Sequence, residues 1–387
     1  MHIFLNALGA STASGLTYLK NVLPHLAWHR DVRTTVALSS RLQPEFRRFG
    51  GIAFADIPDM PGTAQRFWFE QRHLPALVRK SRADVLISAG NFALHNSPVP
   101  QILLSGNSLY TSADFYRDLL ARREYRMWLD TRAKALFAKK SVLWADSTVA
   151  PTRAFADELQ HWTGKMVFAI HHGFDREIFF SDQSPLPVQI QRKLDAEKDD
   201  LKLLHVSHYN YFRNFETLLL AVPLLREKLA GRKVRLFLTC RLEEGQNPGS
   251  YRTSSARRLV RQLGIRDEVV ELGTVPYRQL HQIYGACDIY VTAAYAETFS
   301  HTVVEARACG LKVVASDIPV HREVLGDGAL YFSRFSPQEL AERIVQATAI
   351  NSTQVFSATP IDRFSWRRHV EKILTLASGL IQHPLAA

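Results

Sequence analysis

Short runs of apolar, often β-branched residues alternate with amphipathic stretches along most of the chain. Eight of these runs have the length of buried strands and begin at His2, Thr34, Asp84, Pro100, Lys202, Val234, Asp288 and Lys312. Helical patterns lie between them, among them Asn214–Leu229, Arg278–Tyr284 and Phe299–Ala308. Nearly continuous apolar strands that alternate with helices are typical of parallel sheets covered on both faces. The pattern therefore predicts an α/β fold.

A polar, proline-bearing segment, SDQSPLPVQIQRKLDAEKDD from Ser181, separates two such strand–helix series. We predict a linker over residues 181–199, because domain boundaries fall in exposed polar segments of this kind. The first lobe would then span residues 1–180 and the second residues 200–364, both Rossmann-like. A final helical pattern over about residues 365–387 begins near Trp366. The length of 387 residues fits two lobes, since a domain takes ~150 residues.

The composition is that of a globular protein with a basic excess. Hydrophobic residues make up 46% and charged residues 22%, which excludes a disordered or collagen-like chain. The formal charge of +11 favours anionic partners such as phosphates, nucleic acid or an acidic membrane surface. We find no recognition-helix, zinc or RNP-type motif, so we expect no nucleic-acid partner.

Cysteine usage and the N-terminal pattern point to a reducing compartment. Cys240, Cys287 and Cys309 are far apart and odd in number, so they form neither a disulfide framework nor a CxxC metal site. The apolar run after Met1 has no basic start and resembles a first buried strand rather than a signal peptide. Nothing approaches the ~18 apolar residues of a membrane span. We expect a cytoplasmic protein, with peripheral contact at the inner face of the membrane as a further hypothesis.

The stretch from Tyr295 to Phe332, YAETFSHTVVEARACGLKVVASDIPVHREVLGDGALYF, carries the most chemical information. Ser300 can cap a helix that ends before Gly310, which places the backbone N–H groups of residues 298–300 at the positive end of that helix. Such an end binds phosphate without a metal. Glu297 and Glu305 stand eight positions apart around it. The alternative is a capped, solvated helix with two surface acids.

This stretch closely resembles the donor-binding signature of retaining GT-B glycosyltransferases of family 4, the glycosyl transferases group 1. The resemblance includes the turn at Gly310, the strand VVASDIP and the loop Gly326–Ala329. It implies that Glu297 contacts the transferred sugar, Glu305 the ribose, and Thr298, Phe299 and Ser300 the phosphates. It also implies two lobes that face each other across a cleft, with the C-terminal helix crossing back to the first lobe.

Two further segments resemble the same family in the expected order. In LLHVSHYNYFRNFETLLLAVPLL, Ser207, His208 and Arg213 align with the glycine, arginine and lysine that serve the donor phosphates. Arg213 keeps a cation that can bind a diphosphate through its planar fork, and its alternative is a solvated arginine at a helix start. ELGTVPYRQLHQIYGACDIYV resembles the loop that cups the nucleobase, with Thr274 and Val275 as contacts.

The first lobe carries the acceptor-side resemblance. GASTASGLTYLKNVLPHLA resembles the family's first glycine loop, with Ser14 and Gly15 as its contacts. FAIHHGFDREIF resembles the segment that closes this lobe and has His172 where asparagine is common. Many relatives carry a histidine after the strand PQILLSG, whereas this chain has Gly106 and Asn107. Asn107 would hydrogen-bond a sugar hydroxyl there.

These assignments imply transfer of a hexose from a UDP- or GDP-sugar to a hydroxyl group, with retention of configuration, and with Glu297 and Arg213 as catalytic residues. No D-x-D cluster stands at a strand end, so we expect neither a metal nor another cofactor. The expected acceptor is a sugar or a lipid-linked saccharide in polysaccharide or glycolipid assembly. Two alternatives remain, a sugar-nucleotide epimerase of the same fold and a catalytically dead scaffold subunit.

The segment over residues 117–140 bears on the acceptor. It holds eight basic and three acidic residues among apolar ones, a composition typical of a basic amphipathic helix on anionic lipid. The alternative is an ordinary packed helix with a solvated basic face.

Overall fold

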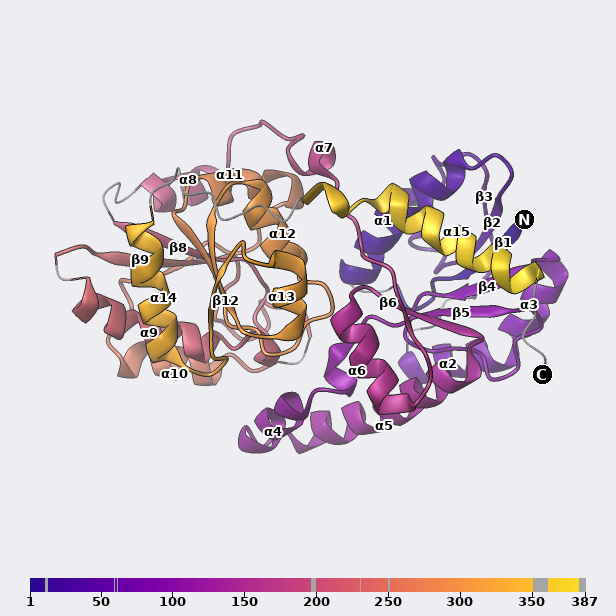
Figure 1. The fold of residues 1–387 in the computed structure, drawn as a ribbon, viewed down its shortest axis with the longest axis horizontal. Helices are drawn as coiled ribbons and strands as arrows, with labels where there is room; N and C mark the ends of the chain where they lie inside the picture. The colour runs from indigo at the N-terminus through magenta and orange to yellow at the C-terminus, as the bar shows by residue number, and fades with distance from the viewer. Residues whose placement is uncertain are drawn as a thin grey trace. The chain divides into compact units, whose positions relative to one another are not determined.

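The computed structural model describes residues 1–10, 13–58, 60, 62–195, 200–229, 231–249, 251–350 and 361–382 (Figure 1). The chain divides into two compact units. The first unit comprises Met1–Ser112, Leu119–Gly173 and Phe364–Ala387, and the second comprises Ala113–Asp118 and Phe174–Arg363. Each unit contains one parallel sheet with helices packed on it, so the predicted α/β class with two Rossmann-like lobes is confirmed.

The first unit is built on a seven-stranded sheet of order β3-β2-β1-β4-β5-β6-β7. Its strands are β1 (His2–Asn6), β2 (Arg33–Ala37), β3 (Ile52–Phe54), β4 (Val85–Ser88), β5 (Gln101–Leu104), β6 (Ser147–Ala150) and β7 (Phe168–Ala169). Its helices are α1 (Ala13–Trp28), α2 (Thr63–Arg72), α3 (Leu74–Ser81), α5 (Tyr125–Trp144), α6 (Arg153–Thr163) and α15 (Trp366–Gln382), with short 3-10 turns η1 (Gln43–Glu45) and η2 (Ser108–Tyr110).

Alternation along the strands explains why both faces of this sheet are covered. Ile3 and Leu5 of β1 pack into one cluster, together with residues of α1 and α15. Phe4 lies between them in sequence and packs into a separate cluster with Leu74 and Val78 of α3. Successive side chains of a strand point to opposite faces, so a strand that is apolar at every position needs a layer on each side.

The C-terminal helix α15 belongs to the first unit. Trp366, Val370 and Ile373 are each at most 5% exposed within the cluster that also holds residues of α1. Its start fits closely against Gly173, where an added Cβ would lie 2.1 Å from the backbone nitrogen of Trp366. The backbone at position 173 therefore has room only for glycine.

The second unit is built on a six-stranded parallel sheet of order β10-β9-β8-β11-β12-β13. Its strands are β8 (Leu201–His205), β9 (Val234–Leu238), β10 (Val269–Glu271), β11 (Ile289–Thr292), β12 (Lys312–Ser316) and β13 (Leu330–Phe332). Its helices are α7 (Arg176–Phe179), α8 (Val188–Asp195), α9 (Phe215–Lys228), α10 (Ser254–Gln262), α11 (Leu280–Gly285), α12 (His301–Ala308), α13 (Pro319–Leu325) and α14 (Pro337–Ala349), with 3-10 turns η3 (Tyr211–Arg213), η4 (Tyr277–Gln279) and η5 (Ile361–Arg363).

The segment that we expected to link the lobes, residues 181–199, lies within the second unit as far as it is described. Ile190 and Leu194 of α8 are buried. The side chain of Gln279 donates to the Oγ of Ser184 at 2.8 Å. The chain passes from the first unit to the second between Gly173 and Phe174 instead. Polarity alone did not distinguish this packed amphipathic segment from a linker.

Residues 113–118 form a short excursion from the first unit to the second. They open α4 (Ala113–Ala121), where Phe115 is 1% exposed and lies 6.5 Å from the ring of Phe212. The hydroxyl of Tyr295 donates to Asp118 at 2.8 Å, and Arg334 forms an ion pair with Asp114 at 2.8 Å. The basic segment 117–140 is therefore two helices, separated near Arg123, whose φ is 59°.

Replacing Gly173 by alanine should destabilise the first unit by about 2 kcal/mol or more, because the new methyl group overlaps Trp366. Gly379→Ala is the matched control in α15, where an added Cβ meets nothing within 4 Å. That change should raise stability by up to ~1 kcal/mol, since alanine favours the helix. All six tryptophans lie in the first unit, so tryptophan fluorescence during urea unfolding reports on this unit. An unchanged midpoint for Gly173→Ala would contradict the packing.

Buried neutral histidines should make the fold acid-sensitive. Burial lowers the pKa of His205, His321 and His369 to about 4. Their contribution to stability is present above pH 6.5, the ordinary pKa of histidine, and is lost as the pH falls from 6.5 toward 4. Each such group changes the unfolding free energy by about 1.4 kcal/mol per pH unit in that window.

The measurement is urea unfolding of the first unit, followed by tryptophan fluorescence between pH 7.5 and pH 4.5. His369→Gln should reduce the slope of the unfolding free energy against pH by about 1.4 kcal/mol per pH unit, the contribution of one histidine. His73→Gln, at an exposed position, should leave the slope as it is. Equal slopes for wild type and His369→Gln would refute the assignment.

Candidate functional site

In the sheet of the second unit, the order of the strands reverses between β8 and β11. These strands are neighbours in the sheet, while β9 and β10 extend to one side and β12 and β13 to the other. In open parallel sheets, ligands bind beyond the carboxyl ends of the strands at such a switch point. Ser207 and His208 follow β8, and Glu297 lies in the segment between β11 and α12. The fold thus brings both predicted donor motifs to one edge of this sheet.

An ion pair joins these two motifs. The Nη1 of Arg213, which ends η3, donates to the Oε1 of Glu297. The side chains of Arg213 and Glu297 are only 20% and 7% exposed. Burial lowers the pKa of Arg213. Since a buried charge is costly unless it is paired, each of the two groups stabilises the charged form of the other.

Arg213 keeps an unused donor beside this pair. Its Nε is buried and has no hydrogen-bond partner. Buried donors without partners are rare because each loses its hydration without compensation. An anion at this position would supply the missing acceptor. The alternative of a solvated arginine at a helix start does not describe this side chain.

The turn before α12 differs from our expectation of a serine cap. Ser300 occupies the N-cap position with a φ of 64°, and its side chain makes no capping hydrogen bond. Its Oγ lies 3.3 Å from the Nε2 of His321 instead. Because the left-handed conformation directs this side chain away from the helix, the helix start is left to its backbone groups. Phe299 is 1% exposed, so its side chain packs inside the unit.

Glu305 is a buried acid rather than a surface one. It is 4% exposed, and its Oε2 accepts a hydrogen bond from the hydroxyl of Tyr284 at 2.9 Å. Burial raises its pKa to about 7, against the opposing effects of Tyr284 and Arg213. With Glu297 at 9% exposure, neither carboxyl fits the alternative of two surface acids.

The loops after β8 and β9 are tied together beside this pair. The backbone N–H of Ser207 donates to the Oγ1 of Thr239 at 3.1 Å, and the Oγ of Ser207 donates to the carbonyl of His208 at 2.7 Å. Burial, with the charge of Arg213, lowers the pKa of His208. His208 is thus held mainly neutral at pH 7, and Arg213 carries the positive charge.

The two residues expected at the nucleobase follow β10. Thr274 lines a cavity of about 420 Å³ together with Gly273 and Arg241. Val275 is 8% exposed. Thr274 is exposed and its neighbour Val275 is buried, so the position expected at the base combines an accessible polar residue with an apolar one.

The first unit has its own cavity, of about 350 Å³, at the switch point between β1 and β4. Gly9 and Gly90 lie so close there that a Cβ on Gly9 would be 3.1 Å from the Cα of Gly90. Gly15 and His172 both line the cavity. The ring of His172 lies 5.2 Å from that of Trp366. The side chain of Ser14 lies outside the described part of the structure.

Asn107 has a local role that the sequence did not reveal. Its Oδ1 accepts the backbone N–H of Leu109 at 3.1 Å and so caps η2. The amide beside the cavity is Asn91, whose Oδ1 accepts the N–H of Gly106 at 2.7 Å. Sequence reasoning also missed Arg66 and Lys134, which line the cavity from helices with no recognisable motif.

Comparison with known proteins finds a family that is similar to part of the chain. The family described as "Glycosyl transferases group 1" matches residues 189–354. D-inositol 3-phosphate glycosyltransferase of Streptosporangium roseum is 26% identical over 283 residues, which cover 70% of this chain and 62% of that protein. The chain thus spans about six-tenths of the length of this curated relative.

Two solved structures share the fold along nearly the whole chain. Sucrose-phosphate synthase from Thermosynechococcus elongatus has a TM-score of 0.72 at 15% identity and covers 99% of both chains. Anabaena HepE in complex with UDP-glucose has a TM-score of 0.68 at 18% identity and covers 98% of this chain and 100% of its own. Residues 189–354 are thus similar to the glycosyl transferases group 1 family, and the two Rossmann-like lobes have the GT-B fold.

Proposed function

We propose that this protein is a glycosyltransferase that transfers a hexose from a nucleoside diphosphate sugar to a hydroxyl acceptor. The buried ion pair of Arg213 and Glu297 at the switch point of the second unit is the observation that carries this proposal. The match of residues 189–354 to the glycosyl transferases group 1 family supports it, as does the similarity to a curated relative named a glycosyltransferase. The related fold of HepE, solved with UDP-glucose, supports a UDP-sugar as the first donor to test.

Each group at the switch point has a role in this proposal. The leaving diphosphate accepts hydrogen bonds from the unused Nε of Arg213 and from the backbone N–H groups of residues 298–300. Glu297 contacts the transferred sugar, and Glu305 accepts the ribose hydroxyls. Ser207 and His208 lie along the diphosphate, and Thr274 with Val275 meets the base. On donor binding, Arg213 divides its donors between Glu297 and the phosphates.

The proposed reaction proceeds with retention of configuration. The bond between the anomeric carbon and the diphosphate oxygen breaks, and the acceptor oxygen forms a bond to that carbon from the same face. The acceptor's hydroxyl proton goes to the departing diphosphate. Arg213 and the amides stabilise the charge that develops on the leaving group, which is where preorganised donors act most strongly.

We propose that no metal or other cofactor takes part, because Arg213 and the helix start supply the positive field at the diphosphate. Transfer should then persist in excess EDTA at the rate seen with Mg²⁺. NMR of the product would give its anomeric configuration, and inversion would contradict the proposed stereochemistry.

Substitutions at the ion pair should separate donor binding from transfer. Glu297→Gln keeps a hydrogen-bond acceptor for Arg213 and should lower the transfer rate at least 10³-fold, a loss of about 4 kcal/mol in transition-state stabilisation. The affinity for UDP or GDP should change less than threefold. Arg213→Gln and Glu305→Gln should each weaken nucleotide binding roughly tenfold, by the loss of one charged hydrogen bond.

Calorimetric titration and a donor-turnover assay measure these effects, and Glu342→Gln, at an exposed acid of α14, is the matched control. Wild-type turnover by Glu297→Gln would refute its role. Isomerised nucleotide sugar without transfer would favour the epimerase alternative. A folded protein that binds no nucleotide would be a scaffold subunit.

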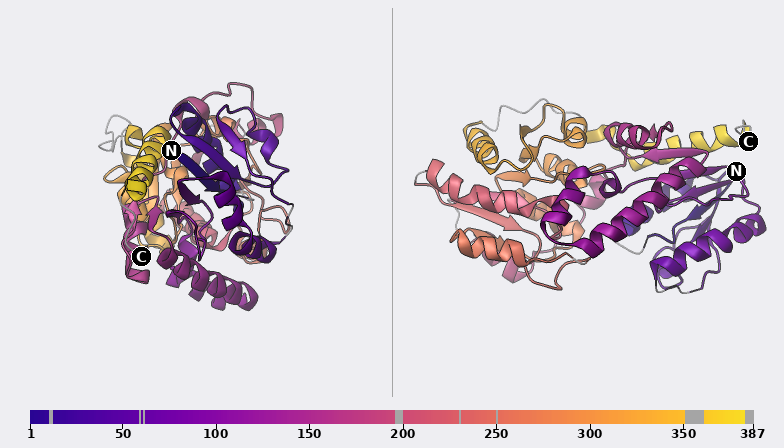
Figure 2. Two further views of the ribbon diagram at one scale, coloured as in Figure 1. Left: turned by 90° about the vertical axis from the view of Figure 1, so that its right-hand side faces the viewer. Right: turned by 90° about the horizontal axis from the view of Figure 1, so that it is seen from below.

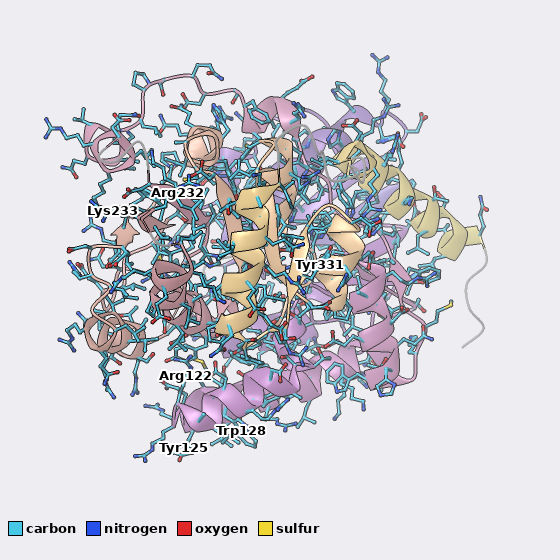
Figure 3. All side chains as sticks on the ribbon, turned by 60° about the vertical axis from the view of Figure 1, so that its left-hand side comes forward. Arg122, Tyr125, Trp128, Arg232, Lys233 and Tyr331 are labelled. Atoms are coloured by element: carbon cyan, nitrogen blue, oxygen red, sulfur yellow. The ribbon has the colours of Figure 1, made fainter. Side chains whose placement is uncertain are left out.

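We also propose that the acceptor is a saccharide on a lipid carrier and that α5 lies on the membrane surface. Tyr125, Leu129, Leu136 and Leu143 are 58%, 62%, 67% and 49% exposed, and their spacing places them on one face of α5. Tyr125, at the start of this helix, is labelled in Figure 3. The exposed cations Arg126, Arg132 and Lys140 stand beside this stripe. α5 lies in front of the sheet of the first unit in the view from below (Figure 2). An apolar stripe with flanking cations suits anionic lipid.

The stripe can be tested with vesicles of phosphatidylglycerol and phosphatidylcholine at low salt. Leu129→Gln with Leu136→Gln should lower the bound fraction at least fivefold, since the apolar contact is lost. Val188→Gln, at an exposed apolar position of the second unit, is the control. Equal flotation of the wild type and the double variant would exclude this surface. Among the residues that the structure describes, no helix has the length and apolar character to cross a membrane.

A further inference from the structure

The cavity of the first unit has a cationic lining. Arg66 of α2 and Lys134 of α5 both border it, close to the glycine loops at the switch point of that sheet. None of the described residues that line the cavity carries a carboxylate. Its remaining polar groups include Asn91, Ser105 and Tyr110. A neutral sugar acceptor alone would not require this charge.

Of the two cations, Arg66 gives the stronger evidence for an anionic ligand in the cavity. Its side chain is only 17% exposed, and its Nε is buried without a hydrogen-bond partner. The nearest carboxylate oxygen, on Glu70, is 4.0 Å from that nitrogen, too far for a hydrogen bond. A half-compensated guanidinium at a cavity wall is costly for the empty protein.

Glu70 is itself a weak counterion. It is 4% exposed, and the Nδ2 of Asn6 donates to its Oε1 at 3.3 Å. Burial raises the pKa of Glu70. This burial disfavours the charged form of Glu70, and at 4.0 Å the contact compensates the charge of Arg66 only in part.

Lys134 adds a second cation that can be redirected. Its Nζ contacts Asp130 at 2.6 Å in an exposed pair, with side-chain exposures of 38% and 58%. Such surface pairs contribute little and exchange readily with other anions. Lys134 can therefore turn to a ligand in the cavity without leaving a buried acid unpaired.

We propose that this cavity binds an acceptor that carries a phosphate group, held by the guanidinium of Arg66 and the ammonium of Lys134. A phosphate monoester carries nearly two negative charges and three acceptor oxygens, which match these two cations and the unused Nε. Arg66 can bind it through its planar fork and Lys134 as a point charge. This inference rests on the proposed function, because it names the acceptor class of that reaction.

The test is calorimetric titration of the whole chain, with saturating UDP present, by glucose, glucose 6-phosphate and glycerol 3-phosphate. Both phosphates should bind at least tenfold more tightly than glucose. Tighter glucose 6-phosphate indicates a phosphorylated sugar as the source, and tighter glycerol 3-phosphate indicates a lipid headgroup. Either order supports the phosphate site.

Arg66→Gln should weaken phosphate binding at least tenfold, while Arg66→Lys, which keeps the charge without the fork, should lose less. Arg72→Gln, at an exposed arginine of the same helix, should bind as the wild type does. Tryptophan fluorescence checks that each variant is folded. If Arg66→Gln does not fold, Lys134→Gln serves in its place and should weaken binding at least threefold.

Three results would overturn the inference: no phosphate binding above that of glucose, binding that survives Arg66→Gln in the folded protein, or phosphate that UDP displaces. The first two leave UDP binding intact, so they refute the acceptor site without refuting the donor site. A protein that binds glucose 6-phosphate through Arg66 but no nucleotide would refute the proposed function and keep the phosphate site.

Discussion

The ion pair between Arg213 and Glu297 is the interaction on which the second unit's site depends. It joins two loops that are 84 residues apart in sequence and that follow neighbouring strands of one sheet. Removing one partner of a buried pair typically costs 3–5 kcal/mol, or about half the stability of many domains, because the other charge remains desolvated. The pair therefore holds both loops in place. In the proposed function, the same two side chains would serve both stability and donor recognition.

The two units carry their candidate sites at equivalent positions of the sheet but build them from different residues. In each, a parallel sheet reverses its strand order once, and the loops at that reversal carry the candidate site. The second unit places charged and hydrogen-bonding side chains there, with three neutral histidines of lowered pKa near Arg213. The first unit places glycines there, so that backbones approach within contact distance and leave a cavity. The second unit thus holds charged side chains in place, whereas the first unit leaves an open cavity.

Much of the architecture could be predicted from the sequence, because strands that are buried on both faces are apolar without interruption. All eight predicted strands are present, and the five others, β3, β6, β7, β10 and β13, have only two to four residues each, too short for a clear periodicity. The donor motif could also be located, since Glu297 stands between a clear strand pattern and the helical pattern that carries Glu305. The ion pair depends on a contact between distant segments, and the conformation of Ser300 depends on one dihedral angle. The cap at Asn107 is local, and assigning this residue to a sugar overlooked the common role of asparagine as a helix cap. Arg66 could not be found, because a single arginine in a helix has no pattern of its own.

The path of the chain between the units bears on how the protein can be divided. It crosses from one unit to the other near residues 112, 118, 173 and 363. A fragment that ends at residue 180 would lack α15 and expose the apolar cluster that Trp366, Val370 and Ile373 cover. It would also leave Phe115 without Phe212. Expression of the first lobe alone therefore calls for fusing the C-terminal helix to residues 1–173, and exchange of lobes between relatives must carry that helix along with the first lobe.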